Sequence, residues 1–74
     1  MSRLIRMDHT GHSTLAEWTA SDQDAYDAAV TAFRRDLEEG YIGVVSEGEG
    51  QATQVRELPA DAELVIMRRP IAGG

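Results

Sequence analysis

The sequence contains one helix-like pattern, over residues 22–39, while the other patterned segments have the two-residue period of β-strands. Ser21 is the predicted N-cap, Asp24 places a carboxylate in the first turn, and Gly40 is the predicted C-cap. One helix covers only one face of a sheet, so the pattern predicts an α+β domain. Apolar residues recur at spacings of three and four and form the predicted buried stripe: Tyr26, Ala29, Val30, Phe33 and Leu37.

Two strand-like runs precede the helix. Residues 3–8 and 13–18 flank a cluster of turn formers that includes Gly11, and together they predict a β-hairpin. Side chains alternate between two faces along each run, and one face is the more apolar. We predict that this hairpin contributes four residues to the core: Ile5, Met7, Ala16 and Trp18.

Three further strand-like runs follow the helix. Residues 41–46 and 52–58 predict a second hairpin around a turn at 47–50. Pro59 then interrupts the pattern, because proline has no N–H for a sheet ladder. The last run, residues 63–68, is apolar on both alternating faces. Such a run is typical of a strand in the middle of a sheet, covered by the helix on one side and partly protected on the other.

Length and charge narrow the classes of function. A chain of 74 residues forms one small domain, and the absence of cysteine removes disulfides and thiolate metal sites. Thirteen acidic and seven basic residues give a formal charge of -6, so we expect no nucleic-acid partner and no attraction to anionic membranes. No apolar run approaches the roughly 18 residues of a membrane span, and the first residues lack the apolar stretch of a signal peptide. We expect a cytoplasmic protein.

Several residue clusters contain the residue types found at chemical sites. Asp8, His9 and His12 are zinc-ligand types, but they lack the usual paired spacing, so we expect a solvated turn and no metal. The segment 48–50 has the glycines of a phosphate loop but carries a carboxylate and no lysine, so we predict no phosphate site here. No spacing indicates a nucleophile with its base, so we predict that the chain is not an enzyme. The helix carboxylates predict an acidic, solvated exterior: Asp22, Asp24, Asp27, Asp36, Glu38 and Glu39.

The C-terminal segment differs from an ordinary chain end. The predicted central strand runs directly into Arg68, Arg69 and Pro70, and the chain then ends in Gly73-Gly74. Glycine has no Cβ, so a diglycine backbone can pass through a narrow channel and approach a reactive phosphate closely. We predict a single domain over residues 1–69 and a flexible tail over residues 70–74, whose reactive group is the Gly74 carboxylate.

The order of hairpin, helix, hairpin and strand resembles the ubiquitin-like β-grasp superfamily. Thr10-Gly11, a strand and then Ser21-Asp22 are similar to the first hairpin and helix start of ubiquitin. Residues 61–74 are similar to the end of the bacterial sulfur carriers, namely the molybdopterin synthase small subunit and the thiamine sulfur carrier, which have an acidic turn, an apolar strand, a proline and a terminal Gly-Gly. The resemblance implies a mixed sheet of about four to five strands on one helix, in the order ββαβ(β)β.

The same resemblance implies a function. An E1-like enzyme would use ATP to adenylate the Gly74 carboxylate. The adenylate would then become a thiocarboxylate that passes its sulfur to an acceptor, or it would be conjugated to a protein target. All catalytic groups would belong to the partner, and this chain would bind no cofactor and be a monomer alone. At Arg68 and Arg69, sulfur carriers have apolar residues or a second proline, and basic residues here are more like ubiquitin. The choice between a sulfur carrier and a protein modifier therefore stays open. The residues implied in recognition and threading are Arg68, Arg69, Pro70, Ile71, Ala72 and Gly73.

A second hypothesis is a non-catalytic β-grasp interaction module with an unprocessed tail. In the final strand, either Val65 and Met67 or the alternating pair Leu64 and Ile66 faces the helix, and the pattern leaves this open. The other pair would lie on the uncovered face, where exposed apolar residues often mark binding sites. We expect three arginines at the rim of that face: Arg56, Arg68 and Arg69.

Overall fold

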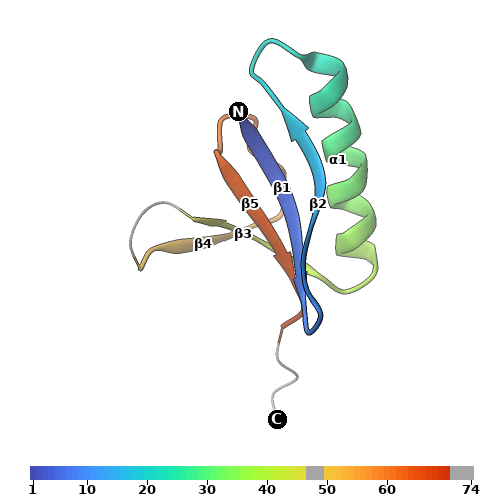
Figure 1. Cartoon of the computed structure of the whole chain (residues 1–74), viewed down its shortest axis with the longest axis vertical. Helices are drawn as coiled ribbons and strands as arrows, with labels where there is room; N and C mark the ends of the chain where they lie inside the picture. The colour runs from blue at the N-terminus through green and yellow to red at the C-terminus, as the bar shows by residue number, and fades with distance from the viewer. Residues whose placement is uncertain (47–49, 71–74) are drawn as a thin grey trace.

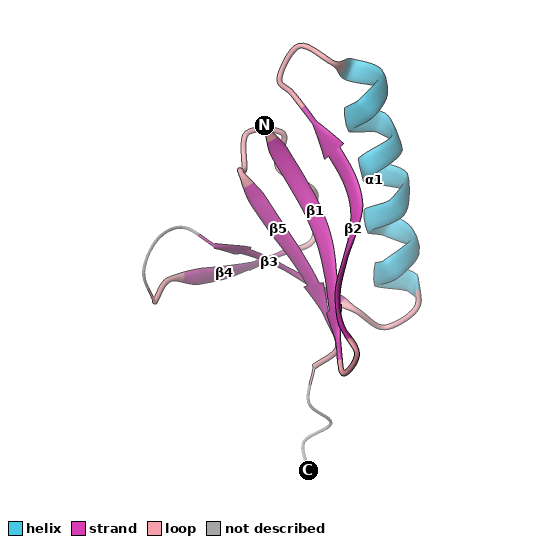
Figure 2. Ribbon diagram, in the orientation of Figure 1, coloured by secondary structure: helices cyan, strands magenta, loops and turns pink. Residues whose placement is uncertain are grey.

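The computed structural model describes residues 1–46 and 50–70, which form one mixed sheet with a helix against one face (Figure 1). The strand order is β2-β1-β5-β3-β4, with β5 parallel to β1 and antiparallel to β3. The α+β class and the central position of the last strand are confirmed (Figure 2). The elements are β1 Ser2–Asp8, β2 Gly11–Trp18, α1 Gln23–Glu38, β3 Ile42–Ser46, β4 Ala52–Val55 and β5 Leu64–Arg68.

The helix begins and ends close to the predicted residues, but its N-cap differs. Asp22 is the cap, because its carboxylate accepts a hydrogen bond from the amide of Ala25 at 3.0 Å. Ser21 lies one residue earlier in the preceding turn, so the predicted serine cap is wrong. The C-cap is Glu39 and not the predicted Gly40, which follows it with φ of 97°, a left-handed conformation that glycine adopts without steric cost.

The first hairpin has a tighter turn than predicted. His9 and Thr10 connect the two strands, and the side chain of Asp8 closes the turn by accepting hydrogen bonds from the hydroxyl and the amide of Thr10. These two bonds favour the ionised carboxylate, the hydroxyl bond more than the amide bond, and hold the pKa of Asp8 below its usual range. The turn is therefore stabilised by local polar contacts on the surface.

The lowered pKa of Asp8 predicts a small acid-dependent contribution to stability. A group with a depressed folded-state pKa stabilises the fold above its unfolded pKa and loses that effect as the pH falls through the folded pKa. Replacing Thr10 by valine removes the hydroxyl bond and should raise the Asp8 pKa toward its ordinary value. Carboxyl chemical shifts followed by NMR over an acid titration measure this pKa. Equal Asp8 pKa values in the two proteins would contradict the assignment.

The second hairpin is shorter on its return strand than the predicted 52–58. β4 ends at Val55, and Leu58 turns inward to become 95% buried in the core. The carbonyls of this segment accept hydrogen bonds from the core aromatics: Leu58 from the Tyr26 hydroxyl, and Ala60 from the Trp18 indole at 3.0 Å. Burial of Leu58 therefore competes with strand pairing and ends β4. Part of the predicted turn, residues 47–49, lies outside the described residues.

The core lies between α1 and the sheet. Val65 and Met67 are fully buried, so this pair of β5 faces the helix, whereas Leu64 and Ile66 are half-buried on the other face. Among the described residues, the buried apolar side chains are Leu4, Trp18, Ala29, Phe33, Val45, Leu58, Val65 and Met67. The predicted helix stripe is confirmed, because Ala29 and Phe33 are buried and the other three members pack around the core.

The predicted core of the first hairpin is half right. Trp18 is buried and Ala16 packs against the core, but the prediction of Ile5 and Met7 is wrong, because Leu4 faces the helix and Met7 is 47% exposed. The pairing shifts from Leu4 opposite Ala16 to Ile5 opposite Thr14, so β2 contains a bulge at this point. β1 itself keeps the two-residue period, but both of its faces carry apolar residues, and the face that is buried is the one with Leu4.

An ion pair with a buried carboxylate lies on the inward face of β1. The Arg6 guanidinium donates two hydrogen bonds to Asp36, from Nε to Oδ2 at 2.9 Å and from Nη2 to Oδ1 at 2.6 Å. Asp36 is 1% exposed, so the prediction that it belongs to the acidic exterior is wrong. It lies three residues after Phe33, on the buried side of α1, where Arg6 compensates its charge. This contact raises the pKa of Arg6 further above neutrality.

Gly43 permits a close contact between β3 and the helix. A Cβ at this position would lie 2.6 Å from Cε1 of Phe33, a ring that is fully enclosed. Replacing Gly43 by alanine should therefore destabilise the fold by about 1–3 kcal/mol through overpacking. Urea denaturation followed by circular dichroism measures this change, and a variant as stable as the parent would show that Phe33 can move away freely.

Candidate functional site

The sheet face opposite α1 carries a continuous apolar row. Ile5 of β1 pairs with Ile66 of β5, and Ile66 pairs with Val44 of β3, so the row crosses the three middle strands. All three side chains are half-buried although no other described element covers them. We call this surface the open face, and its apolar members are Ile5, Met7, Ile42, Val44, Leu64 and Ile66.

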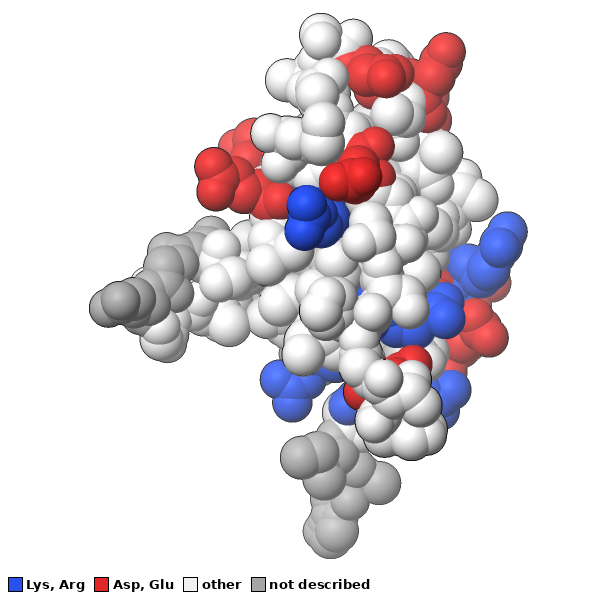
Figure 3. Space-filling model, viewed as in Figure 1, with Lys and Arg blue, Asp and Glu red and all other residues white. Residues whose placement is uncertain are grey.

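Charged side chains border the open face. Arg3 forms an exposed ion pair with Glu17 at 3.4 Å, and Arg68 lies opposite Ile42 near the other end of β5. The surface above β1 and β5 is largely uncharged between such groups (Figure 3). Arg56 instead lines a hollow with Tyr26 of the helix, so its expected place at this rim is wrong. The chain bends after β4 and takes Arg56 to the helix side.

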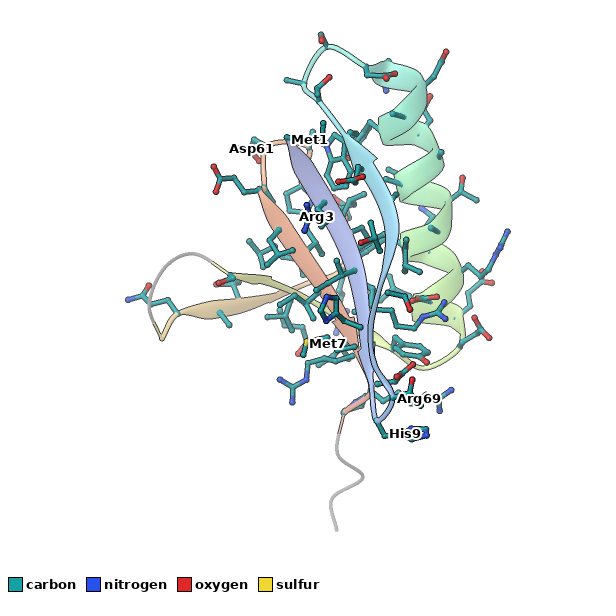
Figure 4. The ribbon with its side chains drawn as sticks, in the orientation of Figure 1. Met1, Arg3, Met7, His9, Asp61 and Arg69 are labelled. Atoms are coloured by element: carbon teal, nitrogen blue, oxygen red, sulfur yellow. The ribbon has the colours of Figure 1, made fainter. Side chains whose placement is uncertain are left out.

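The point where the chain leaves β5 is close to the first hairpin. We call Arg68 and Arg69 the tail root; both are exposed, as is Pro70. Figure 4 shows His9 and Arg69 at the same end of the sheet. A shallow hollow of about 340 Å³ lies here, and it is lined by Met7, Asp8, His9, Arg68 and Arg69. The predicted residues Ile71, Ala72, Gly73 and Gly74 lie outside the described residues.

Sequence reasoning missed Tyr41, which contacts the tail root. The guanidinium carbon of Arg69 lies 4.8 Å from the centre of the Tyr41 ring, and that of Arg6 lies 5.2 Å from the same centre. These residues come from three separate segments of the chain, and no local period links them. Tyr41 follows Gly40, so the pattern identified it only as the start of a strand-like run.

The histidines are not brought together with further ligand types. Among residues 1–46 and 50–70, no group of three or more histidine, cysteine or acidic side chains is placed to hold a metal ion. His9 lies in the turn of the first hairpin. His12 is on β2 and pairs with Met7 of β1. The helix in the described part of the chain is not long and apolar enough to span a membrane. The open face is an apolar surface with charged side chains of both signs at its border, among them Arg3, Glu17 and Arg68.

No family model, curated protein or solved structure matches this chain. The features of this chain that bear on its function are therefore the topology, the open face and the tail root.

Proposed function

We propose that this protein is a ubiquitin-like β-grasp carrier that presents the Gly74 carboxylate to an E1-like, ATP-using enzyme. The observation that carries the proposal is the position of β5. This strand leads directly into the tail, and it is hydrogen-bonded to β1 on one side and to β3 on the other. A strand paired on both edges is a rigid base, so the tail would begin from a fixed point of the domain.

The proposed chemistry needs only a carboxylate from this chain. The Gly74 carboxylate oxygen would attack the α-phosphate of ATP, forming an acyl-adenylate and releasing pyrophosphate. A sulfur nucleophile would then displace AMP to give a thiocarboxylate, or an amine of a target protein would displace AMP to give an amide. The groups that catalyse these steps would belong to the partner, which also holds the ATP.

The activating enzyme would bind the open face. Met7 belongs to the open face and also lines the hollow beside the tail root, so one partner can contact both. The apolar row supplies area for burial, and Arg68 and Arg69 favour a partner whose site has an acidic rim. The overall negative charge of the chain makes this basic end locally distinctive.

Intact mass of the protein from its native host, with an untagged C-terminus, tests the proposal. We expect a species in which one oxygen is exchanged for sulfur, or a ladder of larger adducts. Deletion of Gly74 should remove these species completely. Ala20→Gly is a matched control, because Ala20 is exposed in the turn before α1 and the tail stays intact. An unmodified mass under every growth condition would contradict the carrier proposal.

The exposure of Met7 favours a second candidate, the interaction module with an unprocessed tail. Replacing Met7 by glutamate should weaken partner binding by about thirtyfold if Met7 is a hot spot of about 2 kcal/mol. Thr31→Glu on the exposed side of α1 is the control. Native mass spectrometry of complexes purified from the host distinguishes the candidates. A module keeps its complex when Gly74 is deleted and loses it with Met7→Glu, whereas a carrier loses its modified species in both variants.

A further inference from the structure

The guanidinium groups of Arg6 and Arg69 both contact the ring of Tyr41, close to the point where the chain leaves β5. Arg69 and Arg6 both have their guanidinium carbons within about 5 Å of the ring centre of Tyr41, at 4.8 Å and 5.2 Å. A guanidinium at such a distance is attracted by the ring quadrupole. The tail root is therefore attached to the folded body by a side-chain contact beyond the end of the strand pairing.

Tyr41 also has contacts that do not involve Arg69. The Tyr41 amide donates to the backbone carbonyl of Asp36 at 3.0 Å, which ties the residue to the end of α1. Arg6, on the same ring, is bound by the buried carboxylate of Asp36. Because Asp36 compensates the charge of Arg6, Arg69 approaches the ring without facing an unbalanced cation. The backbone of Tyr41 and the Arg6 contact to its ring are therefore both linked to Asp36 of α1.

The two arginines of the tail root have different surroundings. Arg68 is the last residue of β5 and pairs with Ile42, and within residues 1–46 and 50–70 it forms no salt bridge. Arg69 follows the strand and contacts Tyr41. Pro70 comes next, and its ring restricts φ to about −65°, so the direction set at Arg69 passes to the following residue with one free dihedral fewer.

We propose that Tyr41 is a positioning residue for the tail. By holding Arg69 it limits the directions in which Arg69 and Pro70 leave β5, and this would favour activation of the tail by the partner. The consequence for activation rests on the proposed carrier function, whereas the contact does not. A cation–ring contact at an exposed site corresponds to about a two- to fivefold preference for the held state.

NMR on the isolated, isotope-labelled chain tests the contact directly. In the parent and in Tyr41→Phe, which keeps the ring, the side-chain methylene protons of Arg69 should be displaced upfield by the ring current. Tyr41→Leu should abolish that displacement and lower the heteronuclear Overhauser effect at Ile71, which reports picosecond-to-nanosecond backbone motion. Unchanged Arg69 shifts and an unchanged Ile71 value in folded Tyr41→Leu would overturn the proposal.

A second pair of variants tests the same contact if Tyr41→Leu does not fold. Arg69→Gln removes the cation and leaves Tyr41 in place, so it should lower the Overhauser effect at Ile71 as Tyr41→Leu does. Arg68→Gln is the matched control, because it removes the neighbouring cation that is exposed and opposite Ile42. Equal loss of order in Arg68→Gln and Arg69→Gln would show that charge near the tail, and not the Tyr41 contact, controls its motion.

The modified fraction in the native host connects positioning to function. Tyr41→Leu should reduce the fraction of Gly74-modified chains by about two- to fivefold, with recovery in Tyr41→Phe. If the parent chain itself is never modified, the carrier proposal fails while the NMR result still decides the contact. If the parent is modified, and the fraction is unchanged in Tyr41→Leu although NMR shows the tail root released, the positioning role is overturned.

Discussion

Replacing Arg6 by methionine should destabilise the protein by about 3–5 kcal/mol, close to the whole stability of a domain this small. The large cost comes from Asp36, which is 1% exposed and would be left as a buried carboxylate without its cation. The Arg6 side chain is partly exposed, so the loss of its own packing contributes less to the destabilisation. Urea denaturation followed by circular dichroism gives the free energy of unfolding, and we expect the variant to be largely unfolded at 37 °C.

Two further variants decide whether the ion pair is the cause. Arg3→Met makes the same substitution on the same strand but breaks only an exposed pair with Glu17, so it should cost less than about 1 kcal/mol. The double variant Arg6→Met with Asp36→Leu removes both charges, and it should recover most of the lost stability because no buried charge is left unpaired. A double variant as unstable as Arg6→Met would assign the effect to the register of β1 and not to the pair.

Replacing Phe33 by alanine should cost about 3–5 kcal/mol, because its ring is 1% exposed and fills the space between α1 and β3. The same denaturation experiment measures it. Arg34→Ala, at the next position and exposed, is the matched control and should change the stability by less than about 0.5 kcal/mol.

The contact between Phe33 and Gly43 supplies an independent check on the same prediction. Gly43→Ala is costly in the parent, since its new Cβ would lie 2.6 Å from the Phe33 ring. In the Phe33→Ala background that ring is gone, so Gly43→Ala should be nearly neutral there and the two changes should be strongly non-additive. Additive free energies would show that Gly43 is needed for the backbone of β3 and not for the approach of the ring.

Part of the candidate site could be predicted from local pattern. The run over residues 63–68 is apolar on both faces, and this identified a central strand leading into Arg68 and Arg69. Tyr41 could not be identified in this way. Its role depends on Arg6 and Arg69 reaching one ring from separate strands, and sequence periodicity reports which residues share a face of one element, not which elements meet.

The apolar periods of the chain were enough to predict the single helix, its buried stripe and an α+β domain, because these depend on regular spacing within one segment. The inward face of β1 was not predictable, since Leu4 on one face competes with Ile5 and Met7 on the other. The packing of the elements decides it: Leu4 is buried and Arg6 contacts Asp36 of the helix, while Ala16 and Trp18 lie on the same side of β2, two residues apart. A buried charge needs a counter-charge from a distant segment, and only the packing of the elements brings the two together.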